Sequence, residues 1–129
     1  MKSNDSSADD NALSKVLVVD DDGPILRALQ ARLNHAGYRV STARDGTTAL
    51  ISAGESAPDV AVLDINMPGL DGFSVAEKLR EALPDIGLVF LTASKAPECR
   101  TRAADLGAAY MEKPFDSKNL MEKIGEFDG

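Results

Sequence analysis

The sequence predicts an α/β protein, a three-layer sandwich built on a five-stranded parallel sheet, and two observations support this prediction. From Lys15 onward, short apolar runs alternate five times with helical patterns, which is typical of repeated strand–helix units. One of these runs, Val60 to Leu63, is apolar at every position, as expected of a strand buried on both faces of a parallel sheet. Right-handed helical crossovers between such strands then place helices on both faces.

The first strand is predicted at 16–19, where four apolar residues end at Asp20-Asp21-Asp22. The helix that follows has Pro24 in its first turn, apolar residues at helical spacing, and Gly37 as a stop signal. Its predicted core-facing positions are Leu26, Leu29 and Leu33. Asp22 either caps this helix, which we favour, or ligates a metal directly.

The second strand, predicted at 38–42, is more polar and alternating, as an edge strand would be. Asp45 can cap the next helix, and Gly54 and Pro58 are expected to mark its end. The third strand is the apolar run at 60–63, which stops at Asp64.

Asp64 is predicted to lie in a loop at the carboxyl end of the third strand. Met67-Pro68-Gly69 cannot extend a central strand, because proline lacks an amide donor and glycine favours turns. In open parallel sheets, ligands collect outside the carboxyl ends of the strands. Asp64 is therefore a candidate reactive group, although a single aspartate here would also suit a helix cap or a solvated loop.

The fourth strand is predicted at 86–91, directly before Thr92, after a helix that Asp71 can cap and Pro84 closes. Pro97 then opens a helix that ends at Gly107. This helix has few large apolar residues, so we expect it to pack loosely.

The fifth strand is predicted at 108–111, directly before the motif Glu112-Lys113-Pro114-Phe115. Asp116 or Ser117 then caps a last helix, whose inward positions are expected to be Leu120, Met121 and Ile124.

Composition limits the kinds of partner. The 129 residues suit one domain, and the formal charge of −7 argues against nucleic acid or an anionic membrane held by bulk electrostatics. The single cysteine, Cys99, excludes an internal disulfide and a cysteine-based zinc cluster, and fits a reducing, cytoplasmic compartment. Residues 1–14 are polar and are expected to form a disordered leader before the domain at 15–126.

Chemically reactive side chains follow four of the predicted strands: Asp20 and Asp21, Asp64, Thr92 and Lys113. If the strand order is 2-1-3-4-5, the first and third strands are neighbours and the three carboxylates converge. Because like charges repel, a cation is implied, and an all-oxygen ligand set suits Mg²⁺. Lys113 and Thr92 would then meet an incoming anion, and the combination indicates phosphoryl transfer.

These motifs resemble the receiver domain of two-component response regulators, over essentially Lys15 to Ile124. The matching stretches are Val-Val-Asp-Asp-Asp at 18–22, Leu-Asp-Ile-Asn-Met-Pro-Gly-Leu-Asp-Gly at 63–72, Leu-Thr-Ala at 91–93 and Lys-Pro-Phe at 113–115. The resemblance implies a flavodoxin-like fold and a phosphorylation-dependent signalling switch rather than an enzyme acting on other substrates.

The resemblance also implies the roles of individual residues. Asp64 would accept a phosphoryl group from a histidine kinase or a phosphotransfer protein. Asp21 and Asp64 would bind Mg²⁺ through their side chains, Asn66 through its backbone carbonyl, and Asp20 largely through water. Lys113 and Thr92 would each bind a phosphoryl oxygen, and Asn66 and Ser94 would tune the phosphate lifetime.

The implied readout is a movement of Thr92 toward the phosphoryl group, after which Tyr110 turns inward. The face made by the helix at 97–106, the strand at 108–111 and the last helix would change, controlling a downstream protein target or a phosphorylation-dependent homodimer. Tyr110 can also be read as a static edge aromatic. A cis peptide bond at Lys113-Pro114 would be in keeping with the family, while Arg100 and Arg102 are expected to be solvated charges rather than partner contacts.

Other functions remain open at this point. The chain is either a stand-alone regulator or a fragment of a larger regulator or hybrid kinase. Leu17 to Asp22 also fits the opening motif of haloacid-dehalogenase-like phosphatases, in which Asp20 rather than Asp64 would be the nucleophile. A degenerate receiver that binds partners without phosphorylation is a third reading, against which the intact set of Asp64, Thr92 and Lys113 argues.

Overall fold

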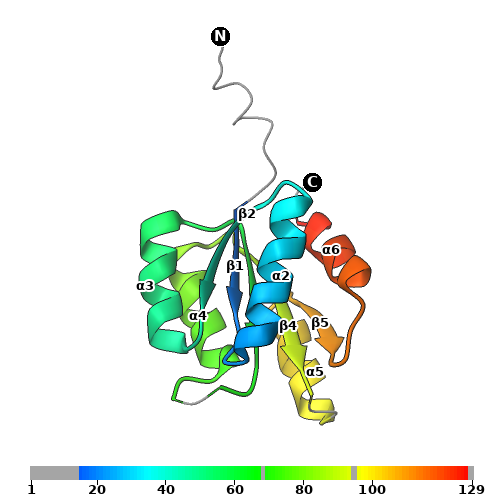
Figure 1. Ribbon diagram of the computed structural model, residues 1–129. Coiled ribbons are helices and arrows are strands. Elements are labelled where there is room, and N and C mark those ends of the chain that lie inside the picture. The colour runs from blue at the N-terminus through cyan, green and yellow to red at the C-terminus, as the bar shows by residue number, and fades with distance from the viewer. Residues whose placement is uncertain (1–14, 68, 94–95, 128–129) are drawn as a thin grey trace.

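The computed structural model describes residues 15–67, 69–93 and 96–127. Strands and helices alternate along the chain (Figure 1). The elements are β1 (Lys15–Val19), α2 (Gly23–His35), β2 (Arg39–Ala43), α3 (Gly46–Ser56), β3 (Val60–Asp64), α4 (Gly72–Ala82), β4 (Gly87–Thr92), α5 (Pro97–Asp105), β5 (Ala109–Glu112) and α6 (Ser117–Gly125).

The described strands form one parallel sheet in the order β2-β1-β3-β4-β5, which confirms the predicted order. The central strand β3 is buried at all five positions, whereas the edge strand β2 is only partly buried. The chain order reverses between β1 and β3, so two strands that are distant in sequence end side by side.

Helices cover both faces of the sheet (Figure 1), with α3 and α4 on one side and α2 and α6 on the other. Alternate strand residues point to opposite faces and so contribute to two separate cores. One core joins Leu17, Val19, Leu63 and Phe90 to buried residues of α3, α4 and α5. The other joins Val16, Val18, Val62 and Leu91 to buried residues of α2 and α6.

Aspartates begin four of the helices, as the sequence predicted. The side chain of Asp22 accepts a hydrogen bond from Ile25 N at 3.2 Å, and Asp45 accepts one from Thr48 N at 2.7 Å. Asp71 and Asp116 cap α4 and α6 in the same way. Each cap satisfies an amide that has no partner within its helix.

The boundaries differ from the predictions in several places. β1 begins one residue earlier, at Lys15, and Asp64 is the last residue of β3 and not part of the loop after it, because the ladder with β4 extends to the pair Asp64 and Leu91. Of the two residues expected to mark the end of α3, Pro58 does so and Gly54 does not: the helix continues to Ser56, and Ala57, directly before Pro58, takes a left-handed conformation with φ 48°. The second, fourth and fifth strands each begin and end one residue later than predicted. Hydrogen bonding to the neighbouring strand extends the ladder through Ala43, Thr92 and Glu112, which apolar patterning alone does not indicate.

The helix α5 is weakly anchored, as its composition predicted. Ala103 is its only fully buried residue within the described chain, and its N-terminal Ala96 makes no side-chain capping hydrogen bond. Among the residues that the structure describes, no helix is long and apolar enough to cross a bilayer.

Candidate functional site at the carboxyl edge of the sheet

The sheet register places the predicted reactive residues at one edge. Asp20 follows β1, Asp64 and Thr92 are the last residues of β3 and β4, and Lys113 follows β5. The register pairs near this edge are Val19 with Leu63, Asp64 with Leu91, and Thr92 with Glu112. The pairing continues beyond β5, where Lys113 N donates to Thr92 O at 2.7 Å. The ladder therefore sets the spacing of these side chains.

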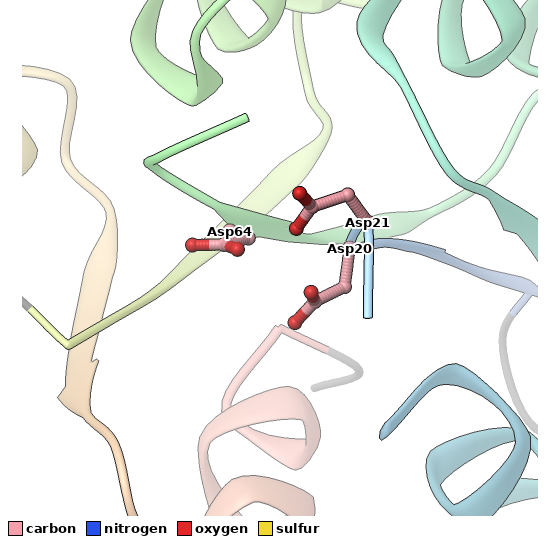
Figure 2. Close-up of side chains that lie close together, drawn as sticks. All are labelled: Asp20, Asp21 and Asp64. Atoms are coloured by element: carbon pink, nitrogen blue, oxygen red, sulfur yellow. The ribbon is translucent and has the colours of Figure 1, made fainter. Parts of the chain in front are cut away.

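Three carboxylates converge at this edge, as predicted. Asp20, Asp21 and Asp64 each offer an oxygen within 4.8 Å of the others, and Figure 2 shows them projecting from the ends of β1 and β3. Asp20 and Asp64 are buried, whereas Asp21 is exposed. An all-oxygen set with one side open to water fits a hard divalent cation such as Mg²⁺.

Lys113 joins the two buried carboxylates. Its Nζ lies 2.9 Å from Asp20 Oδ2 and 3.4 Å from Asp64 Oδ2. Burial disfavours the ammonium form, but the hydrogen bond and charge of Asp20, together with those of Asp64, outweigh this, so the pKa of Lys113 is raised. The sequence suggested that Lys113 would meet an incoming anion, and the structure shows its ammonium group paired with both carboxylates, with the shorter contact to Asp20.

Asp64 is the less restrained of the two buried aspartates. Burial raises the pKa of its carboxyl group, and the charge of Asp20 raises it further, while Lys113 and the Asn66 amide oppose the shift. In Asp20, one oxygen accepts from Asp22 N at 2.9 Å, the other accepts from Lys113 Nζ at 2.9 Å, and no part of the residue is exposed. The oxygens of Asp64 accept from Asn66 N and Lys113 Nζ at the longer distances of 3.2 and 3.4 Å. Asp64, at 5% exposed, retains some contact with solvent.

Thr92 is fully buried beside Asp64, on the neighbouring strand. Asn66, two residues after Asp64, donates from Nδ2 to Thr92 Oγ1 at 3.3 Å. The two residues for which the sequence suggested separate roles, in phosphate binding and phosphate lifetime, are therefore in direct contact. Ser94, the other predicted lifetime residue, and Pro68 lie outside the described residues.

Tyr110 is partly buried and packs against the core on the side of α3, α4 and α5. Burial raises the pKa of its hydroxyl group. The peptide bond between Lys113 and Pro114 is cis, as considered from the sequence.

Arg100 and Arg102 are not simply solvated, which corrects the expectation from sequence. Arg100 Cζ lies 4.6 Å from the centroid of the Tyr110 ring, and Arg102 Cζ lies 4.1 Å from that of Phe73. Both side chains stay more than half exposed, at 63% and 52%. The aromatic partners lie on other elements, so sequence spacing does not reveal these contacts.

Two further residues support the site and were missed as functional residues. A Cβ atom on Gly72 would lie 2.5 Å from Asp64 O and 2.8 Å from Ile65 Cα, so only glycine lets α4 begin this close to the end of β3. The Asp-Gly pair that ends the 63–72 motif was the available signal. Arg44 Nη2 donates to Asp21 O at 3.2 Å, and nothing in the sequence pattern indicates this contact.

The fold and site together define a class: an α/β protein with a flavodoxin-like fold and an acidic cluster, neutralised in part by a lysine, at the point where strand order reverses. Residues 16–125 match the response regulator receiver domain family, and the chain belongs to this family of two-component signalling domains.

Curated relatives include the transcriptional regulatory protein PrrA of Mycobacterium tuberculosis, 43% identical over 111 residues, covering 85% of this chain and 48% of PrrA. The response regulator PleD of Caulobacter vibrioides is 39% identical, covering 86% of this chain and 25% of PleD. The chain thus spans about half the length of the first relatives it matches, or less.

Solved structures show the same fold. The chemotaxis protein CheY4 of Vibrio cholerae superposes with a TM-score of 0.83 at 33% identity, covering 90% of this chain and 99% of CheY4. The receiver domain of DrrB, in a structure described as BeF3-activated, gives a TM-score of 0.81 at 31% identity, covering 89% and 97% of the two chains.

Proposed function

We propose that this chain is a phosphorylation-dependent switch in which Asp64 accepts a phosphoryl group from a phosphohistidine of a partner kinase or phosphotransfer protein. The observation that carries the proposal is the contact of Lys113 Nζ with both Asp20 Oδ2 and Asp64 Oδ2, beside a cluster of three carboxylates. A nucleophile, a counter-charge and a cation site within a few ångströms are the parts that phosphoryl transfer requires.

In the proposed reaction an Asp64 carboxylate oxygen attacks phosphorus. The bond from phosphorus to the histidine nitrogen breaks as the bond to Asp64 forms, and the imidazole leaves with a proton from solvent. The attacking carboxylate must be ionised. Burial opposes this and raises the pKa of Asp64, whereas the Lys113 ammonium favours the ionised form. Lys113 thus both activates Asp64 and would bind a phosphoryl oxygen.

Mg²⁺ fits the donor set found here. Asp20, Asp21 and Asp64 would hold it, with the backbone carbonyl of Asn66 as a further oxygen ligand. When bound, the cation supplies positive charge that offsets the carboxylates and the incoming phosphoryl group.

Asp64 is favoured over Asp20 as the nucleophile. Both oxygens of each aspartate accept a hydrogen bond, but the two contacts of Asp20, at 2.9 Å each, are shorter than those of Asp64, at 3.2 and 3.4 Å. Asp20 is also fully buried, whereas Asp64 is 5% exposed. This argues against the phosphatase alternative, whose first aspartate would have to be reachable by substrate.

The proposed readout begins at Thr92. Its hydroxyl would move to the phosphoryl group and give up the hydrogen bond from Asn66 Nδ2. Tyr110 would follow inward, changing the surface of α5, β5 and α6 that contacts a downstream protein or a second copy of the chain. The weak anchorage of α5 suits an element that moves.

Intact-mass spectrometry tests the proposal. The protein is incubated with acetyl phosphate and Mg²⁺, beside a metal-free control and the variants Asp64→Asn and Asp20→Asn. We expect one phosphoryl adduct that requires both Mg²⁺ and Asp64. A folded protein that binds Mg²⁺ but gains no adduct would favour binding without phosphorylation. Turnover of small phosphate esters that is lost in Asp20→Asn but kept in Asp64→Asn would favour the phosphatase.

A further inference from the structure

The helix α5 lacks the stripe of buried apolar residues that usually holds a helix against a sheet. Ala103 is its only fully buried residue within the described chain, and its N-cap residue, Ala96, has no side-chain oxygen that could make a capping hydrogen bond. Cys99 and Leu106 contact the core only partly. Other contacts must therefore contribute to its position.

Two arginines tether α5 on different sides. Arg100 stacks on Tyr110 of β5, and Arg102 stacks on Phe73 of α4. Residues two apart on a helix do not share a face, so each arginine reaches a different neighbour. A carboxylate accompanies each stack: Glu112 lies 3.3 Å from Arg100, and Glu77 lies 4.0 Å from Arg102.

The partners of Arg100 are related by strand geometry. Tyr110 and Glu112 are two residues apart on β5, so their side chains leave the same face of the strand. Tyr110 packs against the core that α5 helps to cover, and one guanidinium contacts both side chains. Because Arg100 is 63% exposed and Tyr110 is partly buried, the guanidinium covers the ring from the solvent side.

We propose that Arg100 is a positioning residue that holds the Tyr110 ring in its resting place and couples any movement of that ring to movement of α5. We call its stack on Tyr110 and its ion pair with Glu112 the Arg100 clamp. This inference rests on the proposed function, because it concerns the residue expected to transmit the switch. Arg102 holds the same helix through the Phe73 ring of α4 and through Glu77.

The clamp is suited to a reversible switch because both of its contacts are weak. A cation–π contact and an ion pair at exposed positions together shift a two-state equilibrium by about five-fold. A restraint of that size keeps the resting position of the Tyr110 ring dominant before phosphorylation. It is also weak enough for a change at the phosphorylation site to overcome.

The test uses the full chain without any phosphodonor. The chain has two tyrosines, Tyr38 and Tyr110, so selective ¹³C labelling gives two sets of ring signals, which a Tyr110→Phe variant assigns. Relaxation dispersion then measures the minor ring population of Tyr110, since exchange on the microsecond-to-millisecond timescale is visible to that method. The variants are Arg100→Ala and, as the matched control on the same helix, Arg102→Ala.

We expect Arg100→Ala to raise the minor population of Tyr110 about five-fold, and Arg102→Ala, which loosens α5 but keeps the Arg100 clamp, to raise it clearly less. Glu112→Gln, which removes the ion pair but keeps the stack, should give a smaller increase and guards against misfolding of the alanine variant. A wild-type Tyr110 signal in Arg100→Ala, or an equal increase in Arg102→Ala, would overturn the inference. Because no phosphodonor is present, this outcome is separate from the adduct at Asp64 that tests the proposed function.

Discussion

Lys113 Nζ lies closer to Asp20 Oδ2, at 2.9 Å, than to Asp64 Oδ2, at 3.4 Å. The lysine is therefore bound most closely to an aspartate that is fully buried. The ammonium group of Lys113 bridges the two buried carboxylates of Asp20 and Asp64 at the edge of the sheet.

Removing this charge should destabilise the metal-free protein. We expect Lys113→Ala to lower the free energy of unfolding by roughly 1–3 kcal/mol, because a buried carboxylate loses its charged partner. Added Mg²⁺ should restore part of the loss by neutralising the same carboxylates. Urea denaturation with and without Mg²⁺ measures both effects, with Lys118→Ala, an exposed lysine of α6, as the control. Equal losses in the two variants would contradict the prediction.

The fold should require glycine at position 72, because there is no room for a side chain there. In Gly72→Ala the new Cβ would meet the backbone of Asp64 and Ile65, which cannot turn aside as a side chain can. We expect a loss of about 1–3 kcal/mol in unfolding free energy and a slower phosphoryl adduct at Asp64. Thermal denaturation and intact-mass time courses measure the two effects.

Gly54→Ala is the matched control for Gly72, since Gly54 lies inside α3 and a Cβ there would meet nothing within 4 Å. It should stabilise the protein by about 0.4–1 kcal/mol. A Gly72→Ala variant as stable as Gly54→Ala would show that α4 can shift freely.

Asp21 should contribute to metal binding but little to the metal-free fold, because it is the exposed member of the cluster. We expect Asp21→Ala to keep the wild-type unfolding free energy without Mg²⁺ within about 0.5 kcal/mol. The wild type should gain about 2.7 kcal/mol at Mg²⁺ concentrations one hundred times the dissociation constant, and the variant much less. Thermal shift at increasing Mg²⁺ concentration measures this gain, with Asp85→Asn, at a remote and exposed position, as the control. Similar gains in the two variants would show that Asp21 does not bind the metal.

The cap of α3 should make stability depend on pH. The Thr48 amide, by its hydrogen bond to Asp45, lowers the pKa of this carboxyl group. A carboxyl group whose pKa is lowered by folding stabilises the folded state above its unfolded pKa of about 3.9, and this stabilisation is lost as the pH falls through the folded pKa.

Asp45→Asn keeps the cap but removes the titration. The melting temperature of the wild type should exceed that of Asp45→Asn near neutral pH, and the difference should shrink below about pH 4. A difference that is constant from pH 7 to pH 3 would show that the charge of Asp45 makes no contribution.

The strands and the acidic cluster were predictable because they depend on local patterns. An apolar run such as Val60 to Leu63 specifies a buried strand, and parallel strands must end at one edge, so Asp64 and Thr92 could be placed together. The assignment of Lys113 to Asp20 could not be predicted, since it depends on small differences in distance across three strand ends.

Contacts between segments that are distant in the chain could not be predicted from the sequence either. Arg100 and Arg102 have the same side chain and lie on the same helix, yet their aromatic partners, Tyr110 and Phe73, lie on different elements. Only packing reveals which ring lies under which guanidinium. Gly54 was wrongly expected to mark the end of α3, because the helix ends instead at Ala57, in a left-handed conformation that alanine rarely adopts.

The hydrogen bond from Lys113 N to Thr92 O continues the β4–β5 ladder by one step into the site. The reactive side chains are thus spaced by strand pairing and not by the connections at the opposite edge, such as the exposed turn at Pro84 and Asp85. A chain circularly permuted or lengthened at that turn should therefore keep the geometry of its reactive edge, which makes the turn a suitable place to insert a reporter domain.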